Sequence, residues 1–391
     1  MKRLKDHKED LYKCSKCGLC QSVCPIYKAT KNETLLARGR FVVLEAIADS
    51  KLEFTSSIKK NLDICLNCNV CKDFCPSSID AKEIFLSAKS EIIKQNGLPF
   101  TKTYLFFKLK MQIFGLFAKL YRFFQMDKLI PVLTKIKYLP FRRYFQFANH
   151  LFSVKIKKNN VVSNIEKDKK VVFYEGCFNK YINPSSKNAS MKLIKELGYS
   201  ASLLKTECCS ISLLCSGNVD EFKNNALKIV ASVPNDVDYV VSDCDSCVST
   251  LRKYSKYFVE AEEFSKKVIS LADFLLLNNY SSVKGTNRSV TYHKPCHNES
   301  DCESLINNIE NVEYAPLCSN SSCCGFGGEF GLKHTKISRQ ISLKKADDIL
   351  STGAEVVLTA CPSCIMGLAQ GLILKDSDRE ILNISEYLAG K

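Results

Sequence analysis

The chain has 391 residues, of which 46% are hydrophobic and 21 are cysteines, and its formal net charge is +15. This length supports two or three domains with buried cores. The cysteine count is odd, and the charged N-terminus MKRLKDHKED lacks the apolar segment of a signal peptide. We therefore expect a cytoplasmic protein whose reduced cysteines bind metal, and disulfides are disfavoured. No run of eighteen apolar residues occurs, so the sequence predicts no membrane-spanning helix.

Two cysteine runs come first, 14-CSKCGLCQSVCP-25 and 65-CLNCNVCKDFCP-76. Both have the spacing C-x2-C-x2-C-x3-C-P and resemble the motif of bacterial two-cluster ferredoxins. In this spacing three cysteines surround one face of a 4Fe-4S cube, and the fourth, before proline, reaches the other cube. One cubane is therefore expected on Cys14, Cys17, Cys20 and Cys75, and the other on Cys65, Cys68, Cys71 and Cys24. Zinc is disfavoured, because zinc ligands usually come as separated C-x2-C pairs.

Forty residues separate the two runs. Within LLARGRFVVLEAIADS, apolar positions recur at helical spacing, which predicts a helical connection. This arrangement resembles the helical ferredoxin module of respiratory dehydrogenases. Arg38 and Arg40 either face a cluster or a partner, or lie on a solvated helix face, and the sequence leaves both interpretations open.

A basic aromatic segment follows, in which residues 101–150 carry ten Lys or Arg and one acid, Asp127. Gly115 and four polar residues form one narrow stripe at helical spacing, namely Lys108, Gln112, Lys119 and Arg122. Pro131 and Pro140 then break the pattern. Three interpretations stay open: a core or connecting helix, a membrane-surface helix, and a docking site for a partner subunit. Nucleic acid is not expected, since no binding motif accompanies the charge.

From residue 170 the chain repeats itself. VVFYEGC, TECC and VVSDCDSC in the first copy correspond to SVTYHKPC, SSCC and VVLTACPSC in the second, at offsets of 119, 115 and 117 residues. In each copy a strand ends near a lone cysteine, a helix and a short strand lead to the Cys-Cys pair, and a further helix and strand end in C-x-x-C. Alternating strands and helices predict an α/β fold with a mostly parallel sheet. All five cysteines follow predicted strands, so they can converge on one site, where soft thiolates favour iron–sulfur or zinc.

These two patterns, C-x30-CC-x34-C-x-x-C and C-x26-CC-x36-C-x-x-C, resemble the CCG domain of heterodisulfide reductase catalytic subunits. The same domain occurs in iron–sulfur subunits of glycolate oxidase, lactate utilisation proteins and anaerobic glycerol-3-phosphate dehydrogenase. In the heterodisulfide reductases each five-cysteine set holds a noncubane 4Fe-4S cluster. The resemblance implies one set of Cys177, Cys208, Cys209, Cys244 and Cys247, and another of Cys296, Cys323, Cys324, Cys361 and Cys364.

The sequence does not assign a single role to several residues near these motifs. Ser210 replaces the glycine of CCG in the first copy, so the cluster type there stays open. GFGGEFG after the second pair is interpreted as backbone passing close to a cluster. Three cysteines, Cys215, Cys302 and Cys318, are expected to be ordinary small residues. His293 and His297 either tune a cluster by hydrogen bonding or pack.

The order of motifs resembles the glycolate oxidase and glycerol-3-phosphate dehydrogenase subunits over nearly the whole chain. It predicts a helical two-cluster ferredoxin module at 1–98, a basic aromatic connector at 99–167, and α/β CCG domains at 168–284 and 285–391. Two cubane clusters and one or two further, noncubane, iron–sulfur clusters are implied.

No dinucleotide fingerprint, P-loop or catalytic triad is evident. Iron–sulfur clusters carry single electrons, whereas hydroxyacid oxidation needs a hydride acceptor. The resemblance therefore implies an electron-transfer subunit. It would take electrons from an FAD-containing glycolate or lactate dehydrogenase and pass them to quinone, peripherally on the inner face of the cytoplasmic membrane. Alternatives are the glycerol-3-phosphate dehydrogenase subunit, a disulfide or quinone reductase acting at a noncubane cluster, and a metal-storage scaffold.

Overall fold

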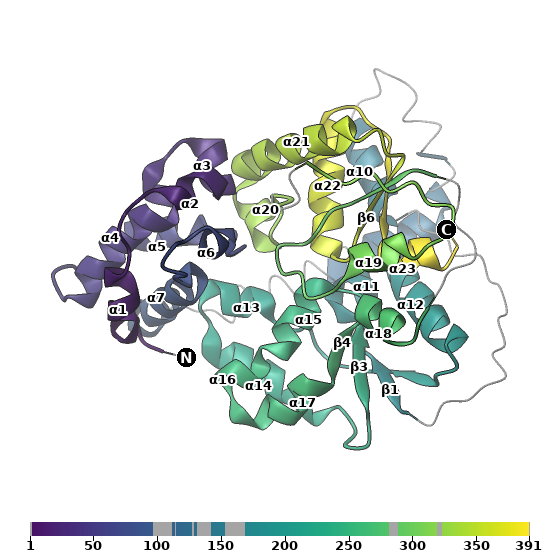
Figure 1. Ribbon diagram of the computed structural model, residues 1–391, viewed down its shortest axis with the longest axis horizontal. Helices are drawn as coiled ribbons and strands as arrows, with labels where there is room; N and C mark the ends of the chain where they lie inside the picture. Colours follow the sequence, from purple (N-terminus) through teal and green to yellow (C-terminus); the bar gives the residue numbers. More distant parts are fainter. Residues whose placement is uncertain are drawn as a thin grey trace.

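The computed structural model describes residues 2–96, 112–113, 115–126, 129–130, 142–152, 169–280, 288–318 and 323–390. A helical N-terminal part is followed by two parallel sheets with helices around them (Figure 1). The α/β class predicted from the alternation of strands and helices is confirmed.

The N-terminal part contains only helices among its described residues, as expected for the connection between the two cysteine runs. Its core lies between α4 and α7, where the rings of Phe41 and Phe85 are 5.7 Å apart. The cysteine runs form the loops around α2 and α6, so this core holds both loops in place. The elements are η1 (Leu4–His7), α1 (Lys8–Tyr12), α2 (Leu19–Val23), α3 (Pro25–Thr30), η2 (Glu33–Leu35), α4 (Ala37–Ala48), α5 (Ser56–Asp63), α6 (Val70–Asp73) and α7 (Ala81–Asn96).

The first sheet has the strand order β2-β1-β3-β4, with all pairs parallel. The central strands β1 and β3 are apolar and buried, as parallel strands covered on both faces must be. Gly198, at φ 86°, follows the end of α12, a position where glycine commonly terminates a helix. The elements are β1 (Val171–Phe173), α11 (Gly176–Tyr181), α12 (Pro184–Glu196), β2 (Ala201–Leu203), α13 (Ile211–Ser216), α14 (Val219–Ala231), β3 (Tyr239–Ser242), α15 (Asp245–Arg252), α16 (Tyr254–Tyr257), η3 (Val259–Ala261), α17 (Glu262–Lys267), β4 (Val268–Ser270) and α18 (Leu271–Leu277).

The second sheet repeats this order as β5-β6-β7. The counterpart of β2 is reduced to one parallel bridge between Val290 and Tyr314. The prediction of a short strand at this place is therefore wrong. The first helix of the repeat, α19, is also shorter than its counterpart α12. The elements are β5 (Val290–Tyr292), α19 (Cys302–Asn307), α20 (Glu329–Lys333), α21 (Thr335–Ser351), β6 (Val356–Thr359), α22 (Pro362–Leu374), β7 (Glu380–Asn383) and α23 (Ile384–Leu388).

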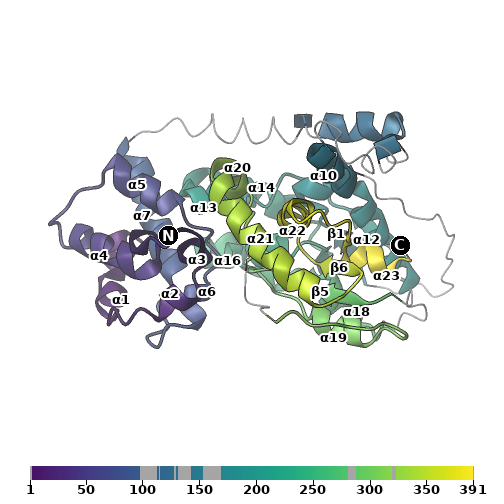
Figure 2. The same ribbon diagram turned by 90° about the horizontal axis from the view of Figure 1, so that it is seen from above.

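The two repeats share one hydrophobic core. Val171 and Phe173 of β1 belong to the same buried cluster as Val356 and Leu358 of β6. α21 connects the repeats to the N-terminal part, since it lies against α3, where Lys344 Nζ donates to the carbonyl of Lys28 at 2.9 Å. Figure 2 shows α20 and α21 between the N-terminal helices and the rest of the molecule. The shared core and this contact fix the relative positions of the cysteine-bearing loops.

The described residues of the basic aromatic segment confirm a helix over 115–123 and include α10 (Arg142–Phe152). Gly115 faces the backbone of Tyr181, and the hydroxyl of Tyr121 donates to Asn149 of α10 at 3.0 Å. Because Lys119 is exposed and Gly115 is buried, the expected stripe runs along the edge of the buried face. Lys108, Asp127, Pro131 and Pro140 lie outside the described residues. No helix among the described residues is long and apolar enough to span a membrane.

Candidate metal centres

Site 1 combines three cysteines of the first run with the last cysteine of the second. Gly18, at φ 87°, turns the backbone between Cys17 and Cys20 and leaves room for the guanidinium of Arg38, which lies 2.9 Å from where a Cβ would stand. The amide of Leu19 lowers the pKa of Cys17, and the charge of Arg38 adds to this effect. The hollow is lined by the four cysteines of the predicted set, Cys14, Cys17, Cys20 and Cys75, and by Cys71 of the neighbouring set.

Site 2 has the reciprocal composition. Asn69, at φ 60°, occupies the position that Gly18 has in site 1, and the amide of Asn67 donates to Cys65 Sγ at 3.4 Å. Arg40 is buried along this hollow and donates to the carbonyl of Ile64 at 2.7 Å. The cysteines that line the hollow are Cys24, Cys65, Cys68 and Cys71. The solvated-face interpretation of Arg40 is therefore wrong, because its side chain packs inside the protein beside site 2.

Burial sets the chemistry of the thiols at site 2. It raises the pKa of Cys24 and of Cys71, because apolar surroundings disfavour the thiolate. A metal cation would supply the positive charge that stabilises thiolates in such a place. Cys71 also lines the hollow of site 1, so the two sites are immediate neighbours.

Site 3 lies where the strands of the first sheet end. The thiols of Cys177 and Cys209 lie beside that of Cys208, and those of Cys209 and Cys244 lie beside that of Cys247, close enough for each to act on its neighbour's pKa. Hydrogen bonding of the Cys247 thiol toward Cys209 and Cys244, together with burial, raises the pKa of Cys247. The five sulfur atoms are therefore grouped as the internal repeat predicts.

Site 4 groups the five equivalent cysteines of the second repeat. The thiols of Cys296 and Cys324 lie beside that of Cys323, and those of Cys324 and Cys361 lie beside that of Cys364, close enough for each to act on its neighbour's pKa. As in site 3, hydrogen bonds and burial raise the pKa of Cys364.

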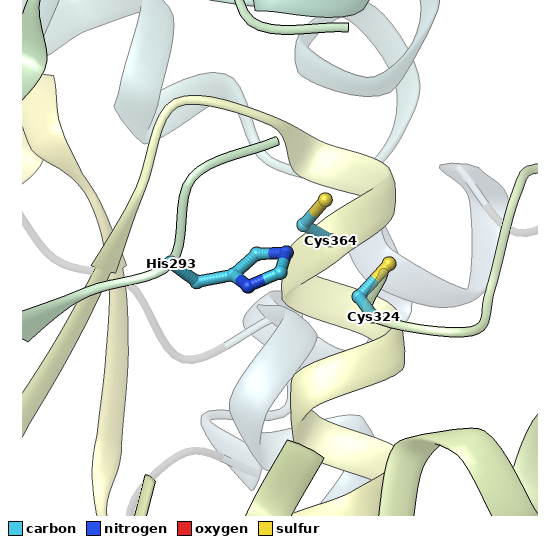
Figure 3. A group of neighbouring side chains, drawn as sticks. All are labelled: His293, Cys324 and Cys364. Atoms are coloured by element: carbon cyan, nitrogen blue, oxygen red, sulfur yellow. The ribbon is translucent and has the colours of Figure 1, made fainter. Parts of the chain in front are cut away.

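His293 adds an imidazole to site 4. It follows β5 directly, is fully buried, and points toward Cys324 and Cys364, as Figure 3 shows. A nitrogen of the ring and the sulfur atoms of these two cysteines all lie within 4.8 Å of one another. Neither ring nitrogen has a nitrogen or oxygen partner for a hydrogen bond among the described residues.

The backbone after each Cys-Cys pair turns in the left-handed region. Gly325 has φ 84°, and Ser210, its counterpart in the first repeat, has φ 61°. A left-handed conformation costs a residue with a side chain about 1–2 kcal/mol. The hydroxyl of Ser210 donates to the carbonyl of Cys208 at 3.0 Å and accepts from Asn225 at 3.3 Å, which offsets part of this cost. The serine thus keeps the turn that glycine gives the second repeat.

Two glycines leave space beside the sulfur atoms. A Cβ on Gly176, which has φ 66°, would lie 3.2 Å from Cys247 Sγ, and a Cβ on Gly367 would lie 3.1 Å from Cys324 Sγ. Thiols gathered in sets of four and five are a donor set suited to iron–sulfur clusters. Cys14, Cys17, Cys20 and Cys75 would hold one cubane cluster, and Cys24, Cys65, Cys68 and Cys71 the other. The sets of sites 3 and 4 would each hold a larger group.

Site 2 adjoins site 4. His297, next to Cys296, has its Nε2 3.1 Å from the carbonyl oxygen of Asn67 and 3.3 Å from Lys82 Nζ. Burial, followed by the charge of Lys82, lowers the pKa of His297 to about 4, so the ring is neutral at pH 7. Burial raises the pKa of Cys68, and the charge of Cys296 adds to this effect. His297 therefore lies at the junction of two cysteine sites.

Site 4 in turn adjoins site 3. The thiols of Cys361 and Cys244 lie beside each other, and the hydroxyl of Ser246 lies 3.2 Å from Cys361 Sγ. The amide of Asp245 donates to the carbonyl of Ala360 at 2.9 Å, which joins the two repeats here. The spatial order is therefore site 1, site 2, site 4, site 3. Sequence reasoning missed Asn67 and Ser246, because neither belongs to a cysteine motif by residue type.

The remaining cysteines lie outside the four sets. Cys302 is buried beside Ser300, and Cys318 is exposed. Cys215 lines a cavity between site 2 and the two repeats, and its carbonyl accepts from the buried ammonium of Lys89 at 3.0 Å.

Comparison with known proteins agrees with this organisation. Residues 10–79 match the 4Fe-4S dicluster domain family, and residues 171–252 and 290–369 each match the cysteine-rich domain family CCG. The lactate utilization protein A of Shouchella clausii is 30% identical over 201 residues, 47% of this chain and 83% of that protein. The chain therefore belongs to the family of iron–sulfur proteins that combine a 4Fe-4S dicluster domain with CCG cysteine-rich domains.

Two further relatives are similar over nearly the whole chain. The probable glycolate oxidase iron-sulfur subunit of Bacillus subtilis is 24% identical over 93% of this chain and 89% of its own length. A dihydromethanophenazine:CoB–CoM heterodisulfide reductase subunit of Methanosarcina mazei is 23% identical over 97% of this chain and 93% of its own length.

Proposed function

We propose that this chain is the iron–sulfur electron-transfer subunit of a flavin-dependent 2-hydroxyacid oxidoreductase acting on glycolate or lactate. The observation that carries the proposal is the unbroken series of cysteine sites from site 1 to site 3. Bound iron–sulfur clusters exchange single electrons, and neighbouring clusters in such a series would pass them through the protein. The sulfur-bearing residues where sites 3 and 4 meet are buried, which keeps water away from that part of the route.

The cofactors we propose are two cubane 4Fe-4S clusters in sites 1 and 2 and one noncubane 4Fe-4S cluster in each of sites 3 and 4. Two complete five-cysteine sets with matching turns support occupancy of both CCG sites. The hydride step would belong to a partner subunit that contains FAD, because none of the motifs in this chain binds a dinucleotide. The names of the glycolate oxidase and lactate utilization relatives support this partner class.

The electron acceptor we propose is quinone at the cytoplasmic face of a membrane. An apolar face, made by Leu116, Phe117, Leu120, Phe123 and Phe124, supports this location. Phe117 is 60% exposed and Phe123 is 78% exposed. A contiguous exposed apolar face of this kind marks a site of interaction. Residues 101–150 carry a charge surplus of +9, from ten basic residues and one acid, which favours an anionic lipid surface.

A second candidate function is reduction of a disulfide at a noncubane cluster. The cavity between site 2 and sites 3 and 4 favours it, because Cys65, Ser246 and Ser363 line the same space. Lys89 also lines it, and its ammonium would attract an anionic substrate. A heterodisulfide reductase subunit is among the relatives.

The decisive experiment is anaerobic. The chain is purified with the flavoprotein that associates with it, and the visible iron–sulfur absorbance is followed as lactate, glycolate or glycerol 3-phosphate is added separately. We expect bleaching by lactate or glycolate when the flavoprotein is present and none when it is absent. Bleaching by glycerol 3-phosphate alone would replace the hydroxyacid by that substrate. Bleaching by dithionite but by none of the three would reject the proposal in favour of the disulfide reductase, which a disulfide reoxidation assay then tests.

A further inference from the structure

Tyr174 and His293 occupy the same position in the two repeats. Each is the first residue after the first strand of its repeat. The amide of Tyr174 donates to Val241 of the neighbouring strand at 2.8 Å, and the amide of His293 donates to Leu358 at 2.8 Å. The two side chains are both buried and both lie beside a pair of cysteines. The repeats therefore offer one position with two different side chains.

The hydroxyl of Tyr174 is already used. It donates to the carbonyl of Glu207 at 2.9 Å, next to the Cys-Cys pair of site 3. A phenol has one proton, so this hydrogen bond leaves none for a sulfur atom of site 3. Burial raises the pKa of Tyr174, and the charges of Cys209 and Cys247 raise it further, which keeps the phenol neutral.

The imidazole of His293 has no comparable hydrogen bond to a carbonyl group among the described residues. A buried ring must carry at least one N–H, and a buried donor without a partner costs about 1–3 kcal/mol. Among the described residues, the nearby groups able to accept this N–H are the sulfur atoms of Cys324 and Cys364. A second donor also reaches site 4, since the hydroxyl of Ser246 lies 3.2 Å from Cys361 Sγ.

We propose that His293 donates its N–H to a sulfur atom of the site 4 cluster and raises the reduction potential of that cluster above that of site 3. This rests on the proposed clusters in both CCG sites. The step is the entry of one electron into the cluster, and the proton stays on the imidazole. An N–H beside the sulfur stabilises the added negative charge. His293 is thus a positioning residue that makes the two otherwise similar CCG sites unequal, and site 4, which adjoins site 2, becomes the electron sink of the pair.

Potentiometric titration of the holoprotein, followed by electron paramagnetic resonance, tests this. The wild type should show two CCG potentials. In H293F, the higher one should fall, because loss of a hydrogen bond to a charged group changes the reduction equilibrium at least about tenfold, or about 59 mV. H293Q, which keeps an N–H, should recover part of the shift, and Y174F should leave the site 3 potential unchanged. Equal potentials in the wild type, or an unchanged potential in H293F, would overturn the inference.

A second readout separates hydrogen bonding from packing. Electron–nuclear double resonance on reduced wild-type protein should detect an exchangeable proton coupled to site 4, lost in H293F and retained in H293Q. A signal that persists in H293F would overturn the role of His293. If no CCG cluster is detected in any variant, the proposed function fails instead, and the two failures are distinguishable. Y174H gives the converse test, since an imidazole at this position should raise the potential of site 3.

Discussion

Cys75 belongs to the second cysteine run but lies with the first. The chain after α6 returns past α2, so Cys75 faces the hollow that holds Cys14, Cys17 and Cys20. Cys24 lies in the other hollow for the same reason, since Pro25 starts α3 and directs it away from site 1. The exchange of the two fourth cysteines is the property of this module that a single substitution tests most directly.

We expect C75S to remove the same cluster as C14S, although the two residues come from different runs. A serine oxygen replaces a soft thiolate poorly, so the cluster of site 1 should be lost while the cluster of site 2 remains. Iron analysis with Mössbauer spectroscopy of the two variants measures this. C318S, at an exposed cysteine outside all four sets, is the control and should retain full iron. If C75S instead matched C65S, the assignment by spacing would be wrong.

The sequence predicts which cysteines gather in one site better than it predicts the surroundings of a single side chain. Spacing grouped the eight ferredoxin-type cysteines, and the internal repeat with the CCG resemblance grouped the other ten. The structure brings each set together, while ligation itself stays a prediction. The role of His293 could not be chosen from the sequence, because an imidazole next to a strand packs or donates according to what surrounds it. The buried position of Arg40 was equally open, since it depends on the carbonyls of Asn61 and Ile64 at the end of α5.

Single helices and strands lie where the sequence predicts them when the hydrophobic periodicity and a bounding proline or glycine agree. α12 begins at Pro184 and ends before Gly198, and β3 and β6 lie where apolar runs precede C-x-x-C. The reduced counterpart of β2 shows the limit, because a strand that pairs by one bridge at Tyr314 is too short to leave a pattern. In the helix over 115–123, polar spacing marked the edge of the buried face and not its centre, since Gly115 and Ala118 supply the close packing.

We expect F117S and F123S to weaken binding to vesicles of anionic phospholipid. Each substitution removes an exposed ring from the apolar face, and burial of a phenylalanine contributes about 1.5–3 kcal/mol. Binding should therefore fall about tenfold for each, as measured by co-sedimentation of the holoprotein. V259S is the matched control, because Val259 is 75% exposed but lies in η3, outside the apolar face. Equal binding by all three variants would reject a membrane role for this face.

The spatial order of the four sites is a property of the whole molecule. The sequence order would put the first CCG site next to the ferredoxin module, whereas it is Cys296 of the second repeat that adjoins Cys68. No local pattern could predict this, because it results from the shared core of the two sheets and from the contact of α21 with α3. The internal repeat predicted which cysteines form each CCG site, but it did not predict which sites are neighbours.

Gly327 lies at the junction of site 2 with the second repeat, which allows the route itself to be tested. A Cβ on Gly327, at φ 51°, would lie 2.8 Å from Leu66, the residue after Cys65, whereas a Cβ on Gly328, at φ 60°, meets nothing within 4 Å. Both substitutions strain the backbone, and G328L does so at least as much, because φ 60° and ψ −114° at Gly328 lie outside the left-handed helical region. Only G327L pushes against Leu66 beside site 2.

We expect G327L to keep its clusters and to slow electron transfer from sites 1 and 2 to site 4, because the two sites are held further apart. G328L should behave as the wild type. Stopped-flow absorbance after anaerobic mixing with the reduced flavoprotein separates an early phase, the reduction of sites 1 and 2, from a later phase, the reduction of site 4. Only the later phase should slow. Slowing of the later phase by an equal amount in both variants would attribute the effect to strain. Unchanged kinetics in G327L, with its clusters intact, would mean that electrons reach the repeats by another route.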